Sequence, residues 1–190
     1  MGTSRGWASA LAEPGVARHL VLVGLPGAGK TSVGRALATL LGRPFVDLDG
    51  EIERRAGRTI AELFAGEGEG AFRAQEAAVS EAMVGQPAAV IAPGGGWMAN
   101  PPAVATLRPA ARIIYLRVSP ATALDRMGPA RAARPLLAGS DPRTALEALL
   151  ARRRALYAVA DHTLDTEALS VAEVAESLVA MAAEWERDEG

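Results

Sequence analysis

The octapeptide Gly24-Leu25-Pro26-Gly27-Ala28-Gly29-Lys30-Thr31 fits the pattern G-x-x-x-x-G-K-[ST]. In this pattern the backbone N–H groups of a glycine-rich loop surround phosphate groups, and the lysine reaches between them. Lys30 is the only lysine among the 20 lysines and arginines of the sequence. A compact ammonium on a flexible stem suits this position better than a planar guanidinium, so the retained lysine itself indicates phosphate binding.

The residues on both sides of the octapeptide have the patterns that a phosphate-binding loop requires. Residues 19–23 form a short apolar run, typical of a buried parallel strand, and residues 31–41 carry apolar side chains at helical spacing up to Gly42. A helix that starts at the loop adds free N–H groups and the positive end of its dipole. We therefore expect the following residues to bind the phosphates of a nucleotide: Gly27, Ala28, Gly29, Lys30, Thr31 and Ser32.

Predicted strands and helices alternate along the rest of the chain. Further strands are expected at 44–48, 88–92, 112–118 and 163–165, and helices at 51–56, after Thr59, and at 69–84, 141–159 and 170–187. This order predicts an α/β fold with a doubly wound, five-stranded parallel sheet, whose ligands lie beyond the carboxyl ends of the strands. We expect residues 1–17 to be a flexible tail, residues 18–190 to be one domain, and the segment of about 128–140, rich in Gly, Pro and Arg, to be a mobile lid.

The composition excludes several classes of protein. The 190 residues are 49% apolar and 22% charged, with a net charge of −2, so no basic field favours nucleic acid. No run of eighteen apolar residues and no secretory leader is evident, and we expect a cytoplasmic monomer with no membrane partner. The chain has no cysteine, which excludes disulfides, thiolate metal sites and cysteine nucleophiles.

Two acidic residues and three glycines follow the second and third predicted strands. Asp47 and Asp49 are two residues apart, so on an extended strand they would point the same way, one toward a metal ion and the other toward an acceptor. Alternatively they are only a strand end and, at Asp49, a helix N-cap. Gly94-Gly95-Gly96 is either a tight turn or a place where a ligand approaches backbone N–H groups closely.

Two groups of arginines are ambiguous on sequence pattern. Arg73 precedes Glu76 by one helical turn, which favours a solvated ion pair over a ligand contact. Residues 152–154 are three consecutive arginines, and most such runs form a solvated face. Three neighbours cannot share one face of a helix, so we expect at least one to turn toward the site or the sheet.

The ordered set of motifs resembles the shikimate kinase family over about residues 18–166. The matching residues are Gly24 to Thr31, Phe45-Val46-Asp47-Leu48-Asp49 with Ile52-Glu53, Gly57-Arg58-Thr59-Ile60-Ala61-Glu62-Leu63-Phe64, Phe72-Arg73 with Glu76, Gly94-Gly95-Gly96, Arg134-Pro135-Leu136-Leu137, and Arg153 four residues before Tyr157. The resemblance implies a P-loop, nucleoside-monophosphate-kinase-like fold and ATP-dependent, Mg²⁺-dependent phosphorylation of the 3-hydroxyl of shikimate.

The resemblance also implies roles for individual residues. Shikimate would be held by Asp49, Arg73, Gly95 and Arg153, with the arginines on its carboxylate and Asp49 near the attacking hydroxyl. Thr31 and Asp47 would support Mg²⁺, Arg126 would pack on adenine, and Lys30, Asp49 and Arg134 would carry the transfer. Bidentate arginines suit a carboxylate, and a carboxylate suits ring hydroxyls, so this assignment is chemically consistent.

Two features depart from the family pattern, and two other functions remain as alternatives. Trp97 follows the glycines where small residues are usual, and would reshape or cover the acceptor pocket; the spacing ahead of Arg134 differs by one residue. Another small-molecule kinase, such as a gluconate kinase, would share the loop and the acidic strand end. A non-catalytic nucleotide-binding module is the other alternative, although guanine recognition by Asn-Lys-x-Asp is excluded because Lys30 is already committed to the loop.

Overall fold

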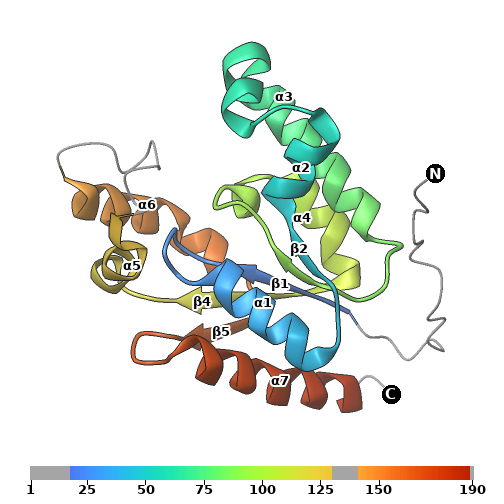
Figure 1. Cartoon of the computed structure of the whole chain (residues 1–190), viewed down its shortest axis with the longest axis vertical. Helices are drawn as coiled ribbons and strands as arrows, with labels where there is room; N and C mark the ends of the chain where they lie inside the picture. Colours follow the sequence, from blue (N-terminus) through green and yellow to red (C-terminus); the bar gives the residue numbers. More distant parts are fainter. Residues whose placement is uncertain (1–17, 130–140, 189–190) are drawn as a thin grey trace, which may run out of the picture.

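The computed structural model describes residues 18–129 and 141–188 (Figure 1). The predicted tail, most of the predicted lid, and Arg134 lie outside these ranges. The elements in chain order are β1 (His19–Val23), α1 (Lys30–Leu41), β2 (Phe45–Asp47), α2 (Leu48–Ala56), α3 (Ile60–Met83), β3 (Val90–Ala92), η1 (Trp97–Ala99), α4 (Pro101–Leu107), η2 (Arg108–Ala110), β4 (Ala111–Arg117), α5 (Pro120–Met127), α6 (Pro142–Tyr157), β5 (His162–Asp165) and α7 (Val171–Asp188).

The five strands form one parallel sheet in the order β2-β3-β1-β4-β5. The central strand β1 is paired on both sides, with Val21 opposite Ile91 of β3 and Ile113 of β4. The prediction of a five-stranded parallel sheet is confirmed. The connection from β1 leads to β2 on one side of the sheet, and the connection from the neighbouring strand β3 leads to β4 on the other side. Ligands of such sheets bind outside the carboxyl ends of two adjacent strands whose connections run in opposite directions.

The apolar run of β1 is explained by burial on both faces of the sheet. Leu20 and Leu22 belong to a core layer that is shared with α1 and α7, whereas Val21 and Val23 belong to a second layer with α3 and α4. Alternate residues of a strand point to opposite faces. Each side chain of β1 must therefore be apolar, or its polar atoms must form hydrogen bonds. Figure 1 shows α1 and α7 on one side of the sheet and α3 and α4 on the other.

Local sequence signals predicted several helix ends correctly. Gly42 closes α1 in the left-handed conformation with φ 64°, and Thr59 begins α3 with a capping box to Glu62. The two helices predicted after Thr59 and at 69–84 join as α3, which is broken at Gly68 (φ 80°, ψ 177°). A helix between β3 and β4 was not predicted: α4 starts with two prolines, which are accepted in a first helical turn.

The second strand is shorter than predicted, and this changes the geometry of its acidic residues. β2 ends at Asp47, and α2 begins at Leu48, so Asp49 lies in the first turn of a helix. The expectation that Asp47 and Asp49 share one face of a strand is therefore wrong. The alternative that made Asp49 an N-cap is also wrong, because the cap is Asp47, whose Oδ1 accepts from Gly50 N at 3.3 Å.

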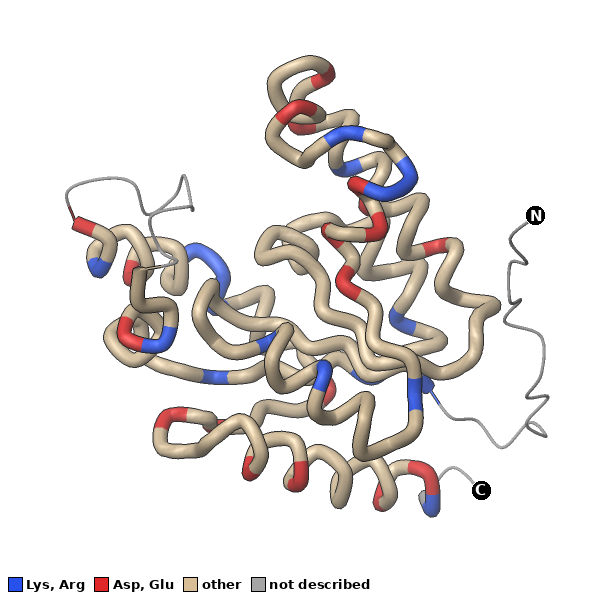
Figure 2. The backbone as a smooth tube through the Cα atoms, viewed as in Figure 1, with Lys and Arg blue, Asp and Glu red and all other residues tan. Residues whose placement is uncertain are grey.

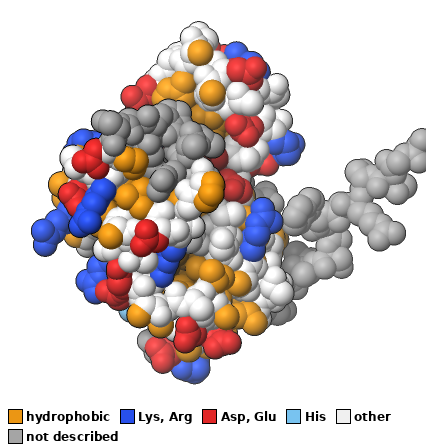
Figure 3. Space-filling view, turned by 60° about the vertical axis from the view of Figure 1, so that its left-hand side comes forward, with side chains coloured by type: hydrophobic (Ala, Val, Ile, Leu, Met, Phe, Trp, Pro, Cys, Tyr) orange, Lys and Arg blue, Asp and Glu red, His pale blue; other side chains and the backbone are white. Residues whose placement is uncertain are grey.

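Charge is distributed over the described surface without one dominant sign. Figure 2 shows acidic and basic positions on most helices, and on the face drawn in Figure 3 the two kinds of side chain are interspersed. Within residues 18–129 and 141–188, no helix is long and apolar enough to cross a membrane.

Candidate active site

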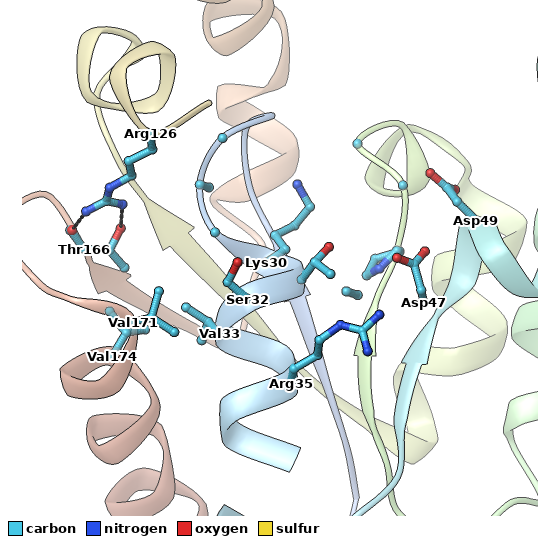
Figure 4. Close-up of a pocket in the computed structure, with 18 of the residues that line it drawn as sticks. Lys30, Ser32, Val33, Arg35, Asp47, Asp49, Arg126, Thr166, Val171 and Val174 are labelled. Carbon is cyan, nitrogen blue, oxygen red and sulfur yellow. Dashed lines mark hydrogen bonds between the residues drawn. The ribbon is translucent and has the colours of Figure 1, made fainter. Parts of the chain in front are cut away.

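A cavity of about 880 Å³ lies at the carboxyl ends of β1, β2 and β3, beside the start of α1 (Figure 4). It is lined by the phosphate loop and α1 (Gly27 to Val33, Arg35), by α2 and its cap (Asp47, Asp49, Gly50, Glu53), by the glycine loop (Ala92 to Gly95), and by Arg126, Thr166, Leu169, Ser170, Val171 and Val174. The three features expected at the strand ends therefore meet in one place.

The phosphate loop presents backbone N–H groups to this cavity. Gly27 has φ +84°, and a Cβ there would lie 2.9 Å from the carbonyl carbon of Ala123, so only glycine fits. The N-cap of α1 is Gly29, which has no capping side chain, and the first turn of α1 contains no acidic residue. The unsatisfied N–H groups and the positive dipole end of α1 are thus open to an anion.

Lys30 lies folded across the loop. Its Nζ donates to the carbonyl oxygens of Gly24 and Leu25, each at 3.1 Å. In Figure 4 its side chain runs from the start of α1 alongside the loop. The ammonium is therefore already in the part of the cavity that the N–H groups surround, held by neutral acceptors that a phosphate oxygen would replace with a charge-assisted bond.

Asp49 is an acidic side chain with a perturbed pKa. Burial is the main cause that raises the pKa of Asp49 to about 6, and the charges of Asp47 and Glu76 act in the same direction. The nearby charge of Lys30 opposes them. A carboxyl group whose pKa is close to neutral, in a cavity beside a phosphate loop, is suited to accept a proton or a hydrogen bond from an acceptor hydroxyl.

Each glycine of the triple-glycine loop faces one predicted acceptor-binding side chain. A Cβ on Gly94 would lie 2.8 Å from Asp49 Oδ2, and one on Gly95 would lie 3.2 Å from Arg153 Nη1. On Gly96 it would lie 2.7 Å from both Nη atoms of Arg73. The glycines therefore admit three charged side chains from α2, α3 and α6 to one loop, a function that neither sequence interpretation of the loop included.

Arg73 forms the predicted ion pair, but the pair is not a solvated one. Its Nη1 donates to Glu76 Oε2 at 3.0 Å, and Glu76 is 1% exposed. Its Nη2 donates to the exposed Glu69, also at 3.0 Å. The second oxygen of Glu76, Oε1, and Asp49 Oδ1 are buried and have no hydrogen-bond partner among the described residues. Such atoms are costly, and they indicate that a polar ligand completes this end of the site.

The three consecutive arginines separate as expected. Arg152 and Arg154 are exposed, whereas Arg153 is half-buried and faces Gly95. Arg73 and Arg153 do not line the cavity itself. They lie against Gly96 and Gly95 of the glycine loop, and Gly95 lines the cavity.

The opposite end of the cavity has an apolar wall and a basic rim. Val33, Val171 and Val174 face one another there, and Arg126 points to Thr166 (Figure 4). Arg126 Nη1 donates to Thr166 Oγ1 at 3.2 Å, and its Nη2 donates to the carbonyl oxygens of Thr166 and Leu169. An apolar slot beside a guanidinium suits a flat heterocyclic base.

Sequence reasoning missed several residues that line the cavity. Glu53 stands one helical turn after Asp49 on α2, and Arg35 one turn after Thr31 on α1, so helical spacing alone could have identified both. The segment from Thr166 to Val174 follows the last strand, and its position at a carboxyl end was the available signal.

Trp97 does not cover the pocket. It is 0% exposed, does not line the cavity, and packs in the core layer that contains Val21 and Val23. Its Nε1 donates to Ser80 Oγ at 3.0 Å. The expectation of bulk beside the substrate is wrong, because the chain turns into η1 directly after Gly96 and carries the indole away from the cavity.

Comparisons with known proteins agree with this geometry. The family model described as shikimate kinase matches residues 26–183. The shikimate kinase of Symbiobacterium thermophilum is 46% identical over 166 residues, which cover 84% of this chain and 95% of that protein. A solved structure, shikimate kinase from Acinetobacter baumannii in complex with shikimate, has a TM-score of 0.80 and 38% identity, covering 88% of this chain and 93% of that one.

A gluconokinase from Sinorhizobium meliloti has a TM-score of 0.58 and only 19% identity, covering 91% of this chain and 95% of that one, which is a likeness of fold alone. The fold alone does not distinguish a shikimate kinase from a gluconokinase, but the family model and the identities to shikimate kinases do. This chain belongs to the shikimate kinase family.

Proposed function

We propose that this chain transfers the γ-phosphoryl group of ATP to the 3-hydroxyl of shikimate in the cavity described above. The observation that carries the proposal is the glycine loop, which brings Asp49, Arg73 and Arg153 together next to a phosphate-binding cavity that Asp49, Gly94 and Gly95 line. Shikimate has one carboxylate and three ring hydroxyls. Two guanidinium groups and one carboxylate are the complementary set.

The acceptor is oriented by charges at its two ends. Arg73 and Arg153 bind the shikimate carboxylate, and Asp49 Oδ1, which has no partner within residues 18–129 and 141–188, accepts a hydrogen bond from a ring hydroxyl. Binding energy gained at the carboxylate, far from the reacting atoms, holds the 3-hydroxyl toward the phosphate loop. All of these side chains come from one chain, which supports a monomer as the functional unit.

The transfer needs little covalent chemistry from the protein. An oxygen–phosphorus bond forms from the 3-hydroxyl to the γ-phosphorus, and the bond to the bridging oxygen of ADP breaks. Lys30 and the N–H groups at the start of α1 stabilise the charge on the phosphate oxygens, and Asp49 receives or orients the hydroxyl proton. Arg134, outside the described residues, is proposed to add charge from the lid, and Arg126 to bind the adenine end.

The residues at the phosphate end fit a magnesium ion. The Thr31 hydroxyl and the Asp47 carboxylate both line the cavity and are hard oxygen donors. Mg²⁺ in phosphoryl-transfer sites is held by one or two such groups together with substrate phosphates and water. When bound, the ion neutralises charge on the transferred phosphoryl group.

A coupled assay of ADP release tests the proposal, with shikimate, gluconate or no acceptor added to the same enzyme. We expect release that depends on shikimate. Activity with gluconate and none with shikimate would show that another small-molecule kinase has been built on this fold. Release that is equal with and without acceptor would indicate a nucleotide-binding module with hydrolysis only.

A further inference from the structure

Asn100 occupies the N-cap position of α4 but does not cap that helix. Asparagine is among the preferred N-cap residues, yet here its side chain makes no hydrogen bond to the first turn. It is 4% exposed, and its Nδ2 donates to two acceptors on α3, the carbonyl oxygen of Arg73 at 2.9 Å and Glu76 Oε2 at 2.8 Å. A buried amide is thus committed to the helix that carries Arg73.

The amide acts on both the backbone and the side chain of Arg73. Glu76 Oε2 accepts from Asn100 and also from Arg73 Nη1, so the carboxylate connects the amide to the guanidinium. Glu76 is almost fully buried, where hydrogen bonds are stronger than in water and the loss of a partner is more costly. Removing the amide would leave the carboxylate free to rotate away from the guanidinium.

A second link joins the same two segments. Trp97 Nε1 donates to Ser80 Oγ, which in turn donates to the carbonyl oxygen of Glu76 at 2.8 Å. Trp97 and Asn100 belong to one turn, in which Asn100 N donates to the carbonyl oxygen of Trp97 at 2.9 Å and Trp97 N to that of Gly94 at 3.1 Å. The chain that leaves the glycine loop is therefore attached to α3 at two points.

We propose that Asn100 is a positioning residue for the acceptor carboxylate. Through Glu76 and the backbone of Arg73 it holds the guanidinium against Gly96, while the bond between Trp97 and Ser80 keeps the glycine loop in register with α3. This inference rests on the proposed function, because it assumes that Arg73 binds a carboxylate. Asn100 itself touches no substrate, so its loss weakens acceptor binding without removing any charge from the site.

The test is a steady-state comparison of the wild-type enzyme with Asn100→Ala, Asn100→Ser and Leu107→Ala. In Asn100→Ala the KM for shikimate rises about tenfold, the KM for ATP stays within about twofold, and kcat changes little. Asn100→Ser keeps one short donor and recovers part of the loss. Leu107 is fully buried in α4, so Leu107→Ala destabilises the same helix without touching the polar contacts, and it leaves the ratio of the two KM values unchanged.

The outcomes separate this inference from the proposed function. Wild-type enzyme that fails to phosphorylate shikimate refutes the proposed function. An active wild type with an unshifted shikimate KM in Asn100→Ala refutes the positioning role. Equal rises of both KM values, or the same selective shift in Leu107→Ala, refute it as well. If Asn100→Ala does not fold, Asn100→Ser decides alone: a selective, smaller shift supports the role, and no shift refutes it.

Discussion

The phosphate end and the acceptor end of this site are built in opposite ways. At the phosphate end, ATP is proposed to meet mainly the backbone of one continuous segment, Gly27 to Ser32, with Lys30 as the only cation contributed by that loop. At the acceptor end, shikimate is proposed to meet side chains from three helices, Asp49 on α2, Arg73 on α3 and Arg153 on α6, which lie around a loop that has no side chains of its own.

The two ends are therefore sensitive to different kinds of substitution. The phosphate end depends on local backbone geometry, so it is damaged by a change inside the loop. The acceptor end depends on distant helices staying in register, so it is also damaged by changes that touch no ligand, such as one at Asn100. Substitutions at one end should therefore affect one substrate and spare the other.

The largest effect is expected at Lys30. Lys30→Ala removes the central positive charge from the phosphate end, and the described surface offers no second lysine because the sequence has only this one. We expect kcat to fall by at least about a thousandfold, as for other charges that stabilise a transferred phosphoryl group. A rapid-quench measurement of single-turnover transfer checks it. Lys30→Arg, which keeps the charge but not the shape, should recover little, and full recovery would show that charge alone is sufficient.

Asp49→Asn should abolish most transfer and, at the same time, stabilise the fold. The pKa of Asp49 is raised to about 6 from 3.8, so the folded state favours the protonated carboxyl. This stabilisation is complete below the unfolded pKa and is lost as pH rises through about 6. At neutral pH the asparagine, which is always neutral, should raise the free energy of unfolding by up to about 3 kcal/mol.

Urea denaturation of wild type and Asp49→Asn at pH values below and above 6 measures this effect. The rate of the wild-type enzyme should depend on pH in the opposite direction to its stability. As the Asp49 carboxylate forms, kcat/KM for shikimate should rise with pH, with an apparent pKa near 6. A variant that is less stable than wild type at neutral pH would contradict the burial argument.

Arg73→Ala should affect only the acceptor. We expect shikimate binding to weaken by about 2 to 5 kcal/mol, because the charge pair between the Arg73 guanidinium and the shikimate carboxylate is lost. ATP binding should be unchanged. Isothermal titration calorimetry with each ligand gives the dissociation constants for shikimate and for ATP. Arg152→Ala is the matched control, since Arg152 is exposed on the same run as Arg153 and should leave both affinities unchanged.

Gly96→Ala is the mildest change at the acceptor end. The added Cβ would lie 2.7 Å from both Nη atoms of Arg73, so the guanidinium must move aside. We expect the KM for shikimate to rise about tenfold, within the usual cost of overpacking. Gly70→Ala, where a Cβ meets no atom of the described part of the chain within 4 Å, serves as the control. An unchanged KM would mean that shikimate binding does not depend on the position of the Arg73 guanidinium against Gly96.

The two ends also differed in how far the sequence could predict them. The phosphate loop is contiguous, so the octapeptide and its flanking strand and helix were sufficient, and the five-stranded parallel sheet followed from the same alternation. The acceptor end depends on residues from 49 to 153, whose proximity only the fold creates. The sequence pattern alone favoured a solvated ion pair between Arg73 and Glu76, and only the family resemblance indicated that Arg73 binds a ligand.

What sequence reasoning missed has identifiable physical causes. The strand end at Asp47 could not be distinguished from Leu48, because an apolar residue suits both a strand and the first turn of a helix. Trp97 could not be placed, because nothing local shows that the chain turns into η1 and buries the indole against Ser80. The partners of Asn100 lie 24 and 27 residues away on another helix, beyond the reach of any local pattern.

The most direct test of the separation of the two ends is a crossed titration. Gly27→Ala and Arg73→Ala are each titrated with shikimate and with a non-hydrolysable ATP analogue. Gly27→Ala, strained at φ +84° and crowded by Ala123, should lose the nucleotide and keep shikimate; Arg73→Ala should do the reverse. If both variants lose both ligands to the same extent, the two ends are not built independently.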